Sequence, residues 1–188
     1  MKSTKKLVIS ALMAAFTCIA TMVIKIQTPT FGYIHLGDSL VLLCGVVLGP
    51  VSGALAAGIG SMLADLFSGY VIWVPATFII KALTAMTAGL LFHRLSRHIP
   101  GKYTQNISLI LGGIIGEAIM VFGYFLFEAG LAAFSNGGFD KVALAAGIAS
   151  SATGIPFNLV QGAVGIVIAS LLLPILKKVA LIRDWINA

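Results

Sequence analysis

Charged side chains are scarce in this sequence. Asp, Glu, Lys and Arg make up 10% of its 188 residues, whereas hydrophobic residues make up 59%. A soluble domain carries about 25% charged residues, and a chain with so few cannot cover a globule of this size with polar groups. Lipid is therefore the expected solvent, and we interpret residues 1–188 as a single integral membrane domain.

Motifs for catalysis and metal binding are also missing. The chain has no Walker sequence, so it cannot energise transport by itself, and it has no H-E-x-x-H metal pair. Its Gly58-Ile59-Gly60-Ser61 places glycine where a nucleophile elbow needs serine. The two cysteines, Cys18 and Cys44, fall inside apolar segments without metal spacing, so we interpret them as packing residues. We expect no enzyme activity, no cofactor and no metal.

The net charge of +6 does not indicate a nucleic-acid partner. No basic run with interleaved aromatic residues is present. The positive charges instead follow the pattern of a membrane topology, in which Lys and Arg accumulate on the cytoplasmic side.

Six apolar segments predict an all-α bundle of six transmembrane helices, at about 7–24, 38–48, 51–68, 71–93, 106–128 and 146–176. The basic Met1–Lys6 stretch before the first segment resembles a signal peptide, but we expect an uncleaved helix. Six crossings place both termini on one side, together with nine basic residues: Lys2, Lys5, Lys6, Arg94, Arg97, Lys102, Lys177, Lys178 and Arg183. Only Lys25 and Lys141 lie opposite. The prediction is a multi-pass protein of a bacterial-type plasma membrane with cytoplasmic termini.

The second and third segments form a short hairpin. Gly49-Pro50 divides them, because proline cannot donate a backbone hydrogen bond and disfavours helix in the residue before it. Residues 39–48 would rise only about 15 Å as a helix, less than a hydrocarbon core of about 30 Å. Asp65, near the end of the hairpin, is the only acid in this apolar stretch and indicates contact with something polar.

Three later segments each carry polar residues along one helix face. These faces are Trp73, Thr77, Lys81 and Thr84; Glu117, Tyr124 and Glu128; and Ser151, Gly154, Asn158 and Gln161. Helical rise places Lys81, Glu117 and Asn158 near the middle of the membrane, where ionisable groups usually mark a site or a partner. One interpretation is a structural Lys81–Glu117 ion pair. The other makes these residues the floor of an outward-facing cavity with Tyr124, Trp73 and Asp65 on its walls.

The loop at 25–38 carries Tyr33, His35 and Asp38. Aromatic residues at this depth can anchor a protein at the membrane interface. A loop with tyrosine, histidine and aspartate so close together is equally consistent with a lid over a ligand. Both interpretations remain open at this point.

Several stretches together resemble the S components of energy-coupling factor (ECF) vitamin transporters. These are the six-span layout, GYIHLGDSLVLL, LGPVSGALAAGIGSMLADL and PFNLVQGAVG in the last segment. The first segment adds Ala11-x-x-x-Ala15, which resembles the family's small-residue contact with its coupling subunit. The resemblance implies capture of a vitamin from outside, a complex with a transmembrane coupling subunit and two cytoplasmic ATPases, and release by toppling of the bundle.

The pattern looks closest to the subgroup linked to pyridoxine or the hydroxymethyl-pyrimidine precursor of thiamine, both small flat heteroaromatic rings. Trp73 and Tyr124 would stack on such a ring, while Lys81, Glu117 and Asn158 would hydrogen-bond to it. Riboflavin and pantothenate are alternatives. From other classes, a stand-alone channel or a membrane enzyme also remains. The helices turn apolar or small below Lys81, Glu117 and Gln161, which favours a closed cavity over a channel.

Overall fold

The protein is described by a computed structural model covering residues 2–28, 33–98, 101, 103–136, 138 and 140–186. The chain is mostly helical, in the order α1 (Lys2–Val23), β1 (Lys25–Gln27), β2 (Tyr33–His35), α2 (Asp38–Leu48), α3 (Pro50–Phe67), the 3-10 turn η1 (Val71–Trp73), α4 (Val74–Ser96), α5 (Thr104–Ser135), α6 (Lys141–Ala152), α7 (Ile155–Leu176) and α8 (Ala180–Ile186). The all-α prediction is confirmed at this level. A two-stranded hairpin is the addition.

The prediction of six spanning helices is corrected by the structure. Among the described residues, five stretches are long and apolar enough to cross a membrane: 4–23, 50–67, 71–96, 104–135 and 155–176. Helix α2 has 11 residues and α6 has 12, so each is shorter than a typical span. The predicted segment 146–176 is two helices, because the chain breaks at Thr153–Gly154 and α7 begins at Ile155 with Pro156 in its first turn. Most of the stretch 129–145, which lies between the last two predicted segments, is also helical, since α5 continues to Ser135 and α6 begins at Lys141.

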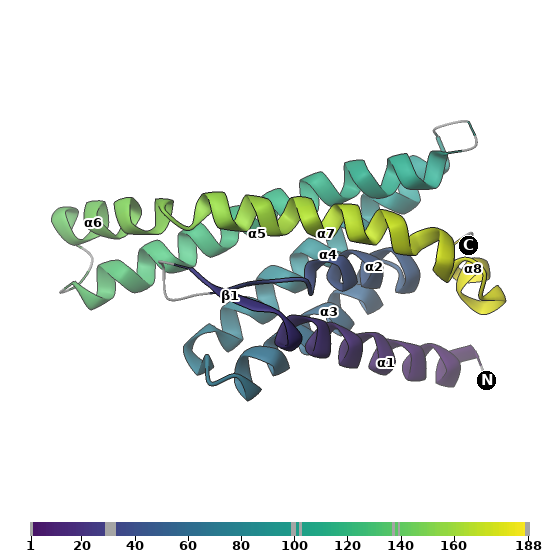
Figure 1. Cartoon of the computed structure of the whole chain (residues 1–188), viewed down its shortest axis with the longest axis horizontal. Helices are drawn as coiled ribbons and strands as arrows, with labels where there is room; N and C mark the ends of the chain where they lie inside the picture. The colour runs from purple at the N-terminus through teal and green to yellow at the C-terminus, as the bar shows by residue number, and fades with distance from the viewer. Residues whose placement is uncertain are drawn as a thin grey trace.

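The helices lie along a common axis, and both termini are at the same end of the bundle (Figure 1). Helices α1, α3 and α5 run away from that end, and α2, α4 and the consecutive pair α6–α7 return to it (Figure 1). The long α5 packs against α6 near its end and against α7 along the rest of its length. The chain therefore makes six passes along the bundle, and five helices in the described ranges have the length of a span.

Local sequence signals explain several helix boundaries. Gly49 has a φ of 80°, which favours glycine, and it forms the corner from which Pro50 begins α3. The side chain of Asp140 caps α6, since its Oδ1 accepts hydrogen bonds from the backbone N–H groups of Val142 and Ala143 at 2.9 and 2.8 Å.

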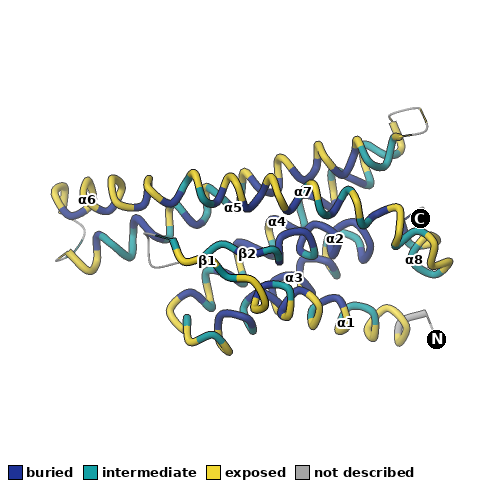
Figure 2. Tube along the Cα trace, in the orientation of Figure 1, coloured by how far each residue is buried: buried dark blue, intermediate teal, exposed yellow. Residues whose placement is uncertain are grey.

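The short helix α2 is the centre of the bundle. Ten of its 11 residues are buried, and Figure 2 shows it dark along most of its length. Close approach to α4 depends on two glycines, because a Cβ at Gly45 would clash with the Ala85 carbonyl and one at Gly89 would lie 2.5 Å from the Gly45 carbonyl oxygen. The apolar side chains of α2 form the main core together with side chains such as Ala85, Phe92 and Leu173 from α4 and α7.

The outer faces of the long helices carry large apolar side chains, as expected for a lipid-facing surface. Examples are Phe16 on α1, Phe122 on α5 and Leu171 on α7, which are 48%, 60% and 67% exposed. Cys18 and Cys44 are buried and free.

Candidate functional site

A polar pocket lies towards the end of the bundle opposite the termini. Its lining comes from the hairpin, from α3 and the turn after it, and from α4, α5 and α7: Thr28, Tyr33, His35, Asp65, Tyr70, Trp73, Thr77, Tyr124, Glu128, Asn158 and Gln161. The free volume between these residues is about 30 Å³. One water molecule needs about 10–15 Å³ of such space, so the pocket holds only a few waters. A larger ligand therefore enters only if part of the lining moves.

Aromatic rings form two walls of this pocket. The ring centroids of Tyr33 and Tyr70 lie 4.7 Å apart, which joins the hairpin to the turn after α3. Trp73 packs at 6.1 Å from Tyr124 and edge-on at 5.2 Å from Phe127. Rings at these distances pack favourably with one another and offer flat apolar faces to a ligand.

Hydrogen bonds attach the aromatic side chains to the helices. The hydroxyl of Tyr33 donates to Asp65 Oδ1 at 2.5 Å, and the hydroxyl of Tyr124 donates to Thr77 Oγ1 at 3.2 Å. Burial and the neighbouring Asp65 carboxylate raise the pKa of Tyr33 above its usual value, so the hydroxyl keeps its proton and remains a donor. The Nζ of Lys25 lies 5.1 Å from the centre of the Tyr33 ring. Tyr33 thereby fastens the hairpin over the pocket.

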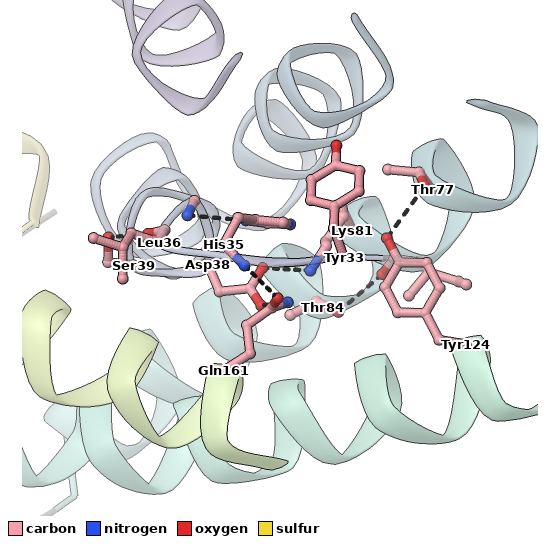
Figure 3. Close-up of polar contacts among 12 residues, drawn as sticks. Tyr33, His35, Leu36, Asp38, Ser39, Thr77, Lys81, Thr84, Tyr124 and Gln161 are labelled. Atoms are coloured by element: carbon pink, nitrogen blue, oxygen red, sulfur yellow. Dashed lines mark hydrogen bonds and ion pairs between the residues drawn. The ribbon is translucent and has the colours of Figure 1, made fainter. Parts of the chain in front are cut away.

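A buried network lies beneath the pocket (Figure 3). Lys81 forms an ion pair with Asp38, and both side chains are 0% exposed. Gln161 donates from Nε2 to Asp38 Oδ2 at 2.6 Å, and its Oε1 accepts the backbone N–H of His35 at 2.8 Å. The network thus connects α4, α2, α7 and strand β2 through four residues.

The interpretation of Lys81 and Glu117 as an ion pair is therefore wrong, because Lys81 forms its ion pair with Asp38. Asp38 is the first residue of α2, and α2 starts deep in the bundle directly after the hairpin, which brings this carboxylate to the level of Lys81. Glu117 is 4% exposed, and neither carboxylate oxygen makes a hydrogen bond with any residue in the described part of the chain. It packs closely against the backbone at Gly162, where an added Cβ would lie 3.2 Å from Oε2.

His35 is a neutral hydrogen-bonding group. Burial, opposed by the Asp38 carboxylate and assisted by Lys81 and Lys25, lowers the pKa of its imidazole to about 3. Its Nδ1 accepts the backbone N–H of Gly37 at 3.0 Å. The proton of the neutral ring therefore resides on Nε2, which is left as a donor.

The structure places eight of the eleven predicted site residues at the pocket: Tyr33, His35, Asp65, Trp73, Thr77, Tyr124, Asn158 and Gln161. Asp38, Lys81 and Glu117 do not line it. The first two support it from below through Gln161. Of the expected mid-membrane floor, Asn158 therefore lines the pocket, whereas Lys81 and Glu117 lie in a layer beneath it.

Three lining residues were not among the predicted site residues: Thr28, Tyr70 and Glu128. Glu128 had a usable signal, because it follows Glu117 and Tyr124 on one helix face. Tyr70 and Thr28 lie in connections whose path the sequence pattern does not indicate. The predicted lid at 25–38 is described only in part, since residues 29–32 lie outside the described ranges.

The predicted partner contact lies on α1. Ala11 and Ala15 are exposed on the face of α1 opposite the buried Met13 and Thr17. A smooth surface of small residues is thus available to another helix.

Comparison with known proteins shows a matching family, a similar solved structure and a similar sequence. The model of the family "ECF-type riboflavin transporter, S component" matches residues 1–178. A solved structure described as "Structure and mechanism of the S component of a bacterial ECF transporter" has a TM-score of 0.63 and 21% sequence identity, and covers 94% of this chain and 97% of that chain. At this identity the likeness shows the fold.

The third match is a Pyrococcus woesei protein described as "Uncharacterized protein in gap 3'region". It is 34% identical over 108 residues, which is 56% of this chain. The match spans 66% of the length of that relative.

Proposed function

Because the chain belongs to the family of S components of ECF-type riboflavin transporters, we propose that it captures a flat heteroaromatic vitamin in the pocket beneath the β1–β2 hairpin. S components are the substrate-binding subunits of ECF transporters, and this family is a class of transport proteins, not of enzymes. The observation that carries the proposal is the pocket itself, which combines aromatic walls with carboxylate, amide and imidazole groups. Such a mixture suits a ring with polar substituents.

The charge of the pocket favours a neutral or cationic ligand. Asp65 and Glu128 both line it, and no lysine or arginine is among the described lining residues. His35 is neutral, and Lys81 is engaged with Asp38. A carboxylate ligand such as pantothenate would place a negative group beside two acidic side chains with no lysine or arginine of the described lining to pair with it, which is unfavourable in a low-dielectric site. We therefore disfavour pantothenate.

Riboflavin is the first ligand to test, because the family description names it. The pyridoxine or hydroxymethyl-pyrimidine subgroup, which the sequence favoured, is the second candidate. The small free volume of about 30 Å³ favours it, since a single ring requires less movement of the lining than a three-ring flavin.

A closed lower end favours capture over conduction. Below the Lys81–Asp38 pair the bundle is filled by fully buried apolar side chains, including Leu42, Val46 and Phe92. A stand-alone channel would need a polar path through this region.

The orientation and the partners follow from the same proposal. The basic residues near the ends of α1, α4 and α7 lie at the end of the bundle that holds the termini (Figure 1). The positive-inside rule makes that end cytoplasmic, which leaves the pocket facing outwards. A coupling subunit that packs on Ala11 and Ala15 would connect the chain to two ATPases. Replacing both alanines with leucine should leave ligand binding intact and reduce assembly and uptake.

The ligand can be identified by native mass spectrometry of the protein purified from its expression host, followed by titration with riboflavin, pyridoxine, hydroxymethyl-pyrimidine and pantothenate. We expect saturable 1:1 binding of riboflavin or of one single-ring compound, and none of pantothenate. Tight binding of pantothenate would contradict the charge argument, and binding of none of the four would contradict the proposed ligand class.

A further inference from the structure

A second and larger hollow lies at the opposite end of the bundle, next to the chain termini. Its volume is about 860 Å³. It is enclosed by the α2–α3 corner, one face of α4, the start of α1 and helix α8: Lys6, Val47, Leu48, Gly49, Pro50, Thr87, Leu90, Leu91, His93, Arg94, Arg97, His98 and Trp185. None of these residues belongs to the vitamin pocket.

Unequal helix lengths create this hollow. Helices α3 and α4 are joined by a short turn at the pocket end, but α3 has 18 residues and α4 has 23. At 1.5 Å per residue, α4 extends about 7 Å further than α3 towards the end that holds the termini. The Gly49–Pro50 corner therefore stops short, and the last turns of α4 form a wall with space beneath the corner.

The wall changes from apolar to basic along α4. Leu90, Leu91 and Arg94 share one face of α4, because they are spaced three and four residues apart, and Arg97 and His98 follow directly after the helix ends. The distance along the axis from Leu90 to Arg97 is about 10 Å. Leu90 is 51% exposed and lies within a span, whereas Arg94 and Arg97 are exposed near its end. This change from apolar to basic side chains follows the change from acyl chains to headgroups across a lipid leaflet.

Two further features favour an anion with an apolar tail. Lys6 adds a cation from α1, and no aspartate or glutamate is among the described lining residues. Trp185 adds an amphipathic ring of the kind that is enriched at the membrane interface. The exposed apolar lower wall is continuous with the lipid-facing side of α4, so an acyl chain can reach it directly from the bilayer.

We propose that this hollow binds an anionic phospholipid from the leaflet at the end of the bundle that holds the termini. Its phosphate would lie between Lys6 and Arg94, and its acyl chains along Leu90 and Leu91. Basic hollows between transmembrane helices on the cytoplasmic side commonly hold such headgroups. The bound lipid would stabilise the corner between α2 and α3. The opposite end of α2 begins with Asp38, which supports the vitamin pocket through Gln161.

The test uses the full chain in nanodiscs that contain equal amounts of phosphatidylglycerol and phosphatidylcholine, and measures lipid retention by native mass spectrometry. We expect the wild type to retain phosphatidylglycerol preferentially. The variant Lys6→Gln/Arg94→Gln should lose this preference by about fivefold per cation, or about 25-fold in total. The matched control Lys177→Gln/Lys178→Gln removes two cations from the same end but outside the hollow, and should behave as wild type.

Further variants distinguish a specific site from general attraction. Lys6→Arg/Arg94→Lys keeps both charges and should retain phosphatidylglycerol, and a thermal melt confirms that each variant is folded. Equal losses in the Lys6/Arg94 and Lys177/Lys178 variants would overturn the proposal, as would complete displacement by soluble glycerol phosphate. It would also be overturned if Lys6→Gln/Arg94→Gln kept the lipid and lost only assembly with a protein partner.

Discussion

The buried Lys81–Asp38 pair gives the sharpest prediction about the support of the pocket. Replacing Lys81 with methionine keeps most of the side-chain length and removes the cation. The Asp38 carboxylate would then remain 0% exposed with Gln161 as its remaining side-chain hydrogen-bond donor, in a region that also contains Glu117. Removing one partner of a buried pair costs about 3–5 kcal/mol. At about 2–4 °C per kcal/mol for a chain of this size, Tm should fall by about 6–20 °C.

A double variant separates the stranded charge from lost packing. Lys81→Gln with Asp38→Asn leaves no charge, allows an amide-to-amide hydrogen bond, and keeps an acceptor for Gln161. It should regain at least half of the lost Tm. The control Lys141→Gln alters an exposed lysine of α6 and should change the free energy of unfolding by no more than about 0.5 kcal/mol.

The assay is a thermal melt of detergent-solubilised protein, followed by intrinsic fluorescence at fixed detergent and salt. A Lys81→Met variant with the same Tm as Lys141→Gln would refute a stabilising role of the buried Lys81–Asp38 pair. A double variant as unstable as the single one would show that the loss comes from packing and not from an unpaired carboxylate.

Three further predictions concern packing, the hairpin and pH. Gly45→Ala should lower Tm clearly, because the added Cβ would clash with the Ala85 carbonyl. A Cβ added at Gly130 in α5 has nothing within 4 Å, so Gly130→Ala should leave Tm unchanged or raise it. Equal Tm values for the two variants would contradict the close α2–α4 contact. Tyr33→Phe removes only the hydroxyl that donates to Asp65, so the ligand dissociation rate in stopped flow should rise by a few-fold to about tenfold, and an unchanged rate would argue against a fastened hairpin. His35 has a folded pKa of about 3 against an ordinary 6.5, so the unfolded chain binds the extra proton first and stability falls as the pH drops below 6.5. At pH 5 this amounts to about 2 kcal/mol; His35→Gln should flatten the decline in Tm between pH 7 and pH 5, and an equally steep decline would exclude this histidine as its source.

The sequence predicted which residues share a helix face better than it predicted which other elements pack against that face. Tyr124 and Gln161 lie at the pocket because a period of 3.6 residues shows which side chains share a face, and their depth follows from helical rise. The partner of Lys81 did not follow, since periodicity within α4 says nothing about which other element packs against it. Asp38 is 43 residues away and reaches Lys81 only because α2 starts deep in the bundle.

The helix lengths show the same limit. The apolar run at 146–176 reads as one segment, and only Pro156 after Thr153–Gly154 signals the break between α6 and α7. The small free volume of the pocket depends on how the hairpin lies over it, which no pattern in the sequence specifies. The short first half of the α2–α3 hairpin could be predicted, because Gly49-Pro50 sets its end.

The two tryptophans allow the most direct test of the central claim, that the ligand binds beneath the hairpin. Trp73 lines the vitamin pocket, whereas Trp185 lines the hollow at the other end, and they are the two tryptophans in the chain. The measurement is fluorescence quenching at saturating ligand in Trp185→Phe, which leaves Trp73 as reporter, and in Trp73→Phe, which leaves Trp185. Strong saturable quenching in Trp185→Phe with a much weaker response in Trp73→Phe is the predicted result, and the reverse order or equal responses would contradict a site at this pocket.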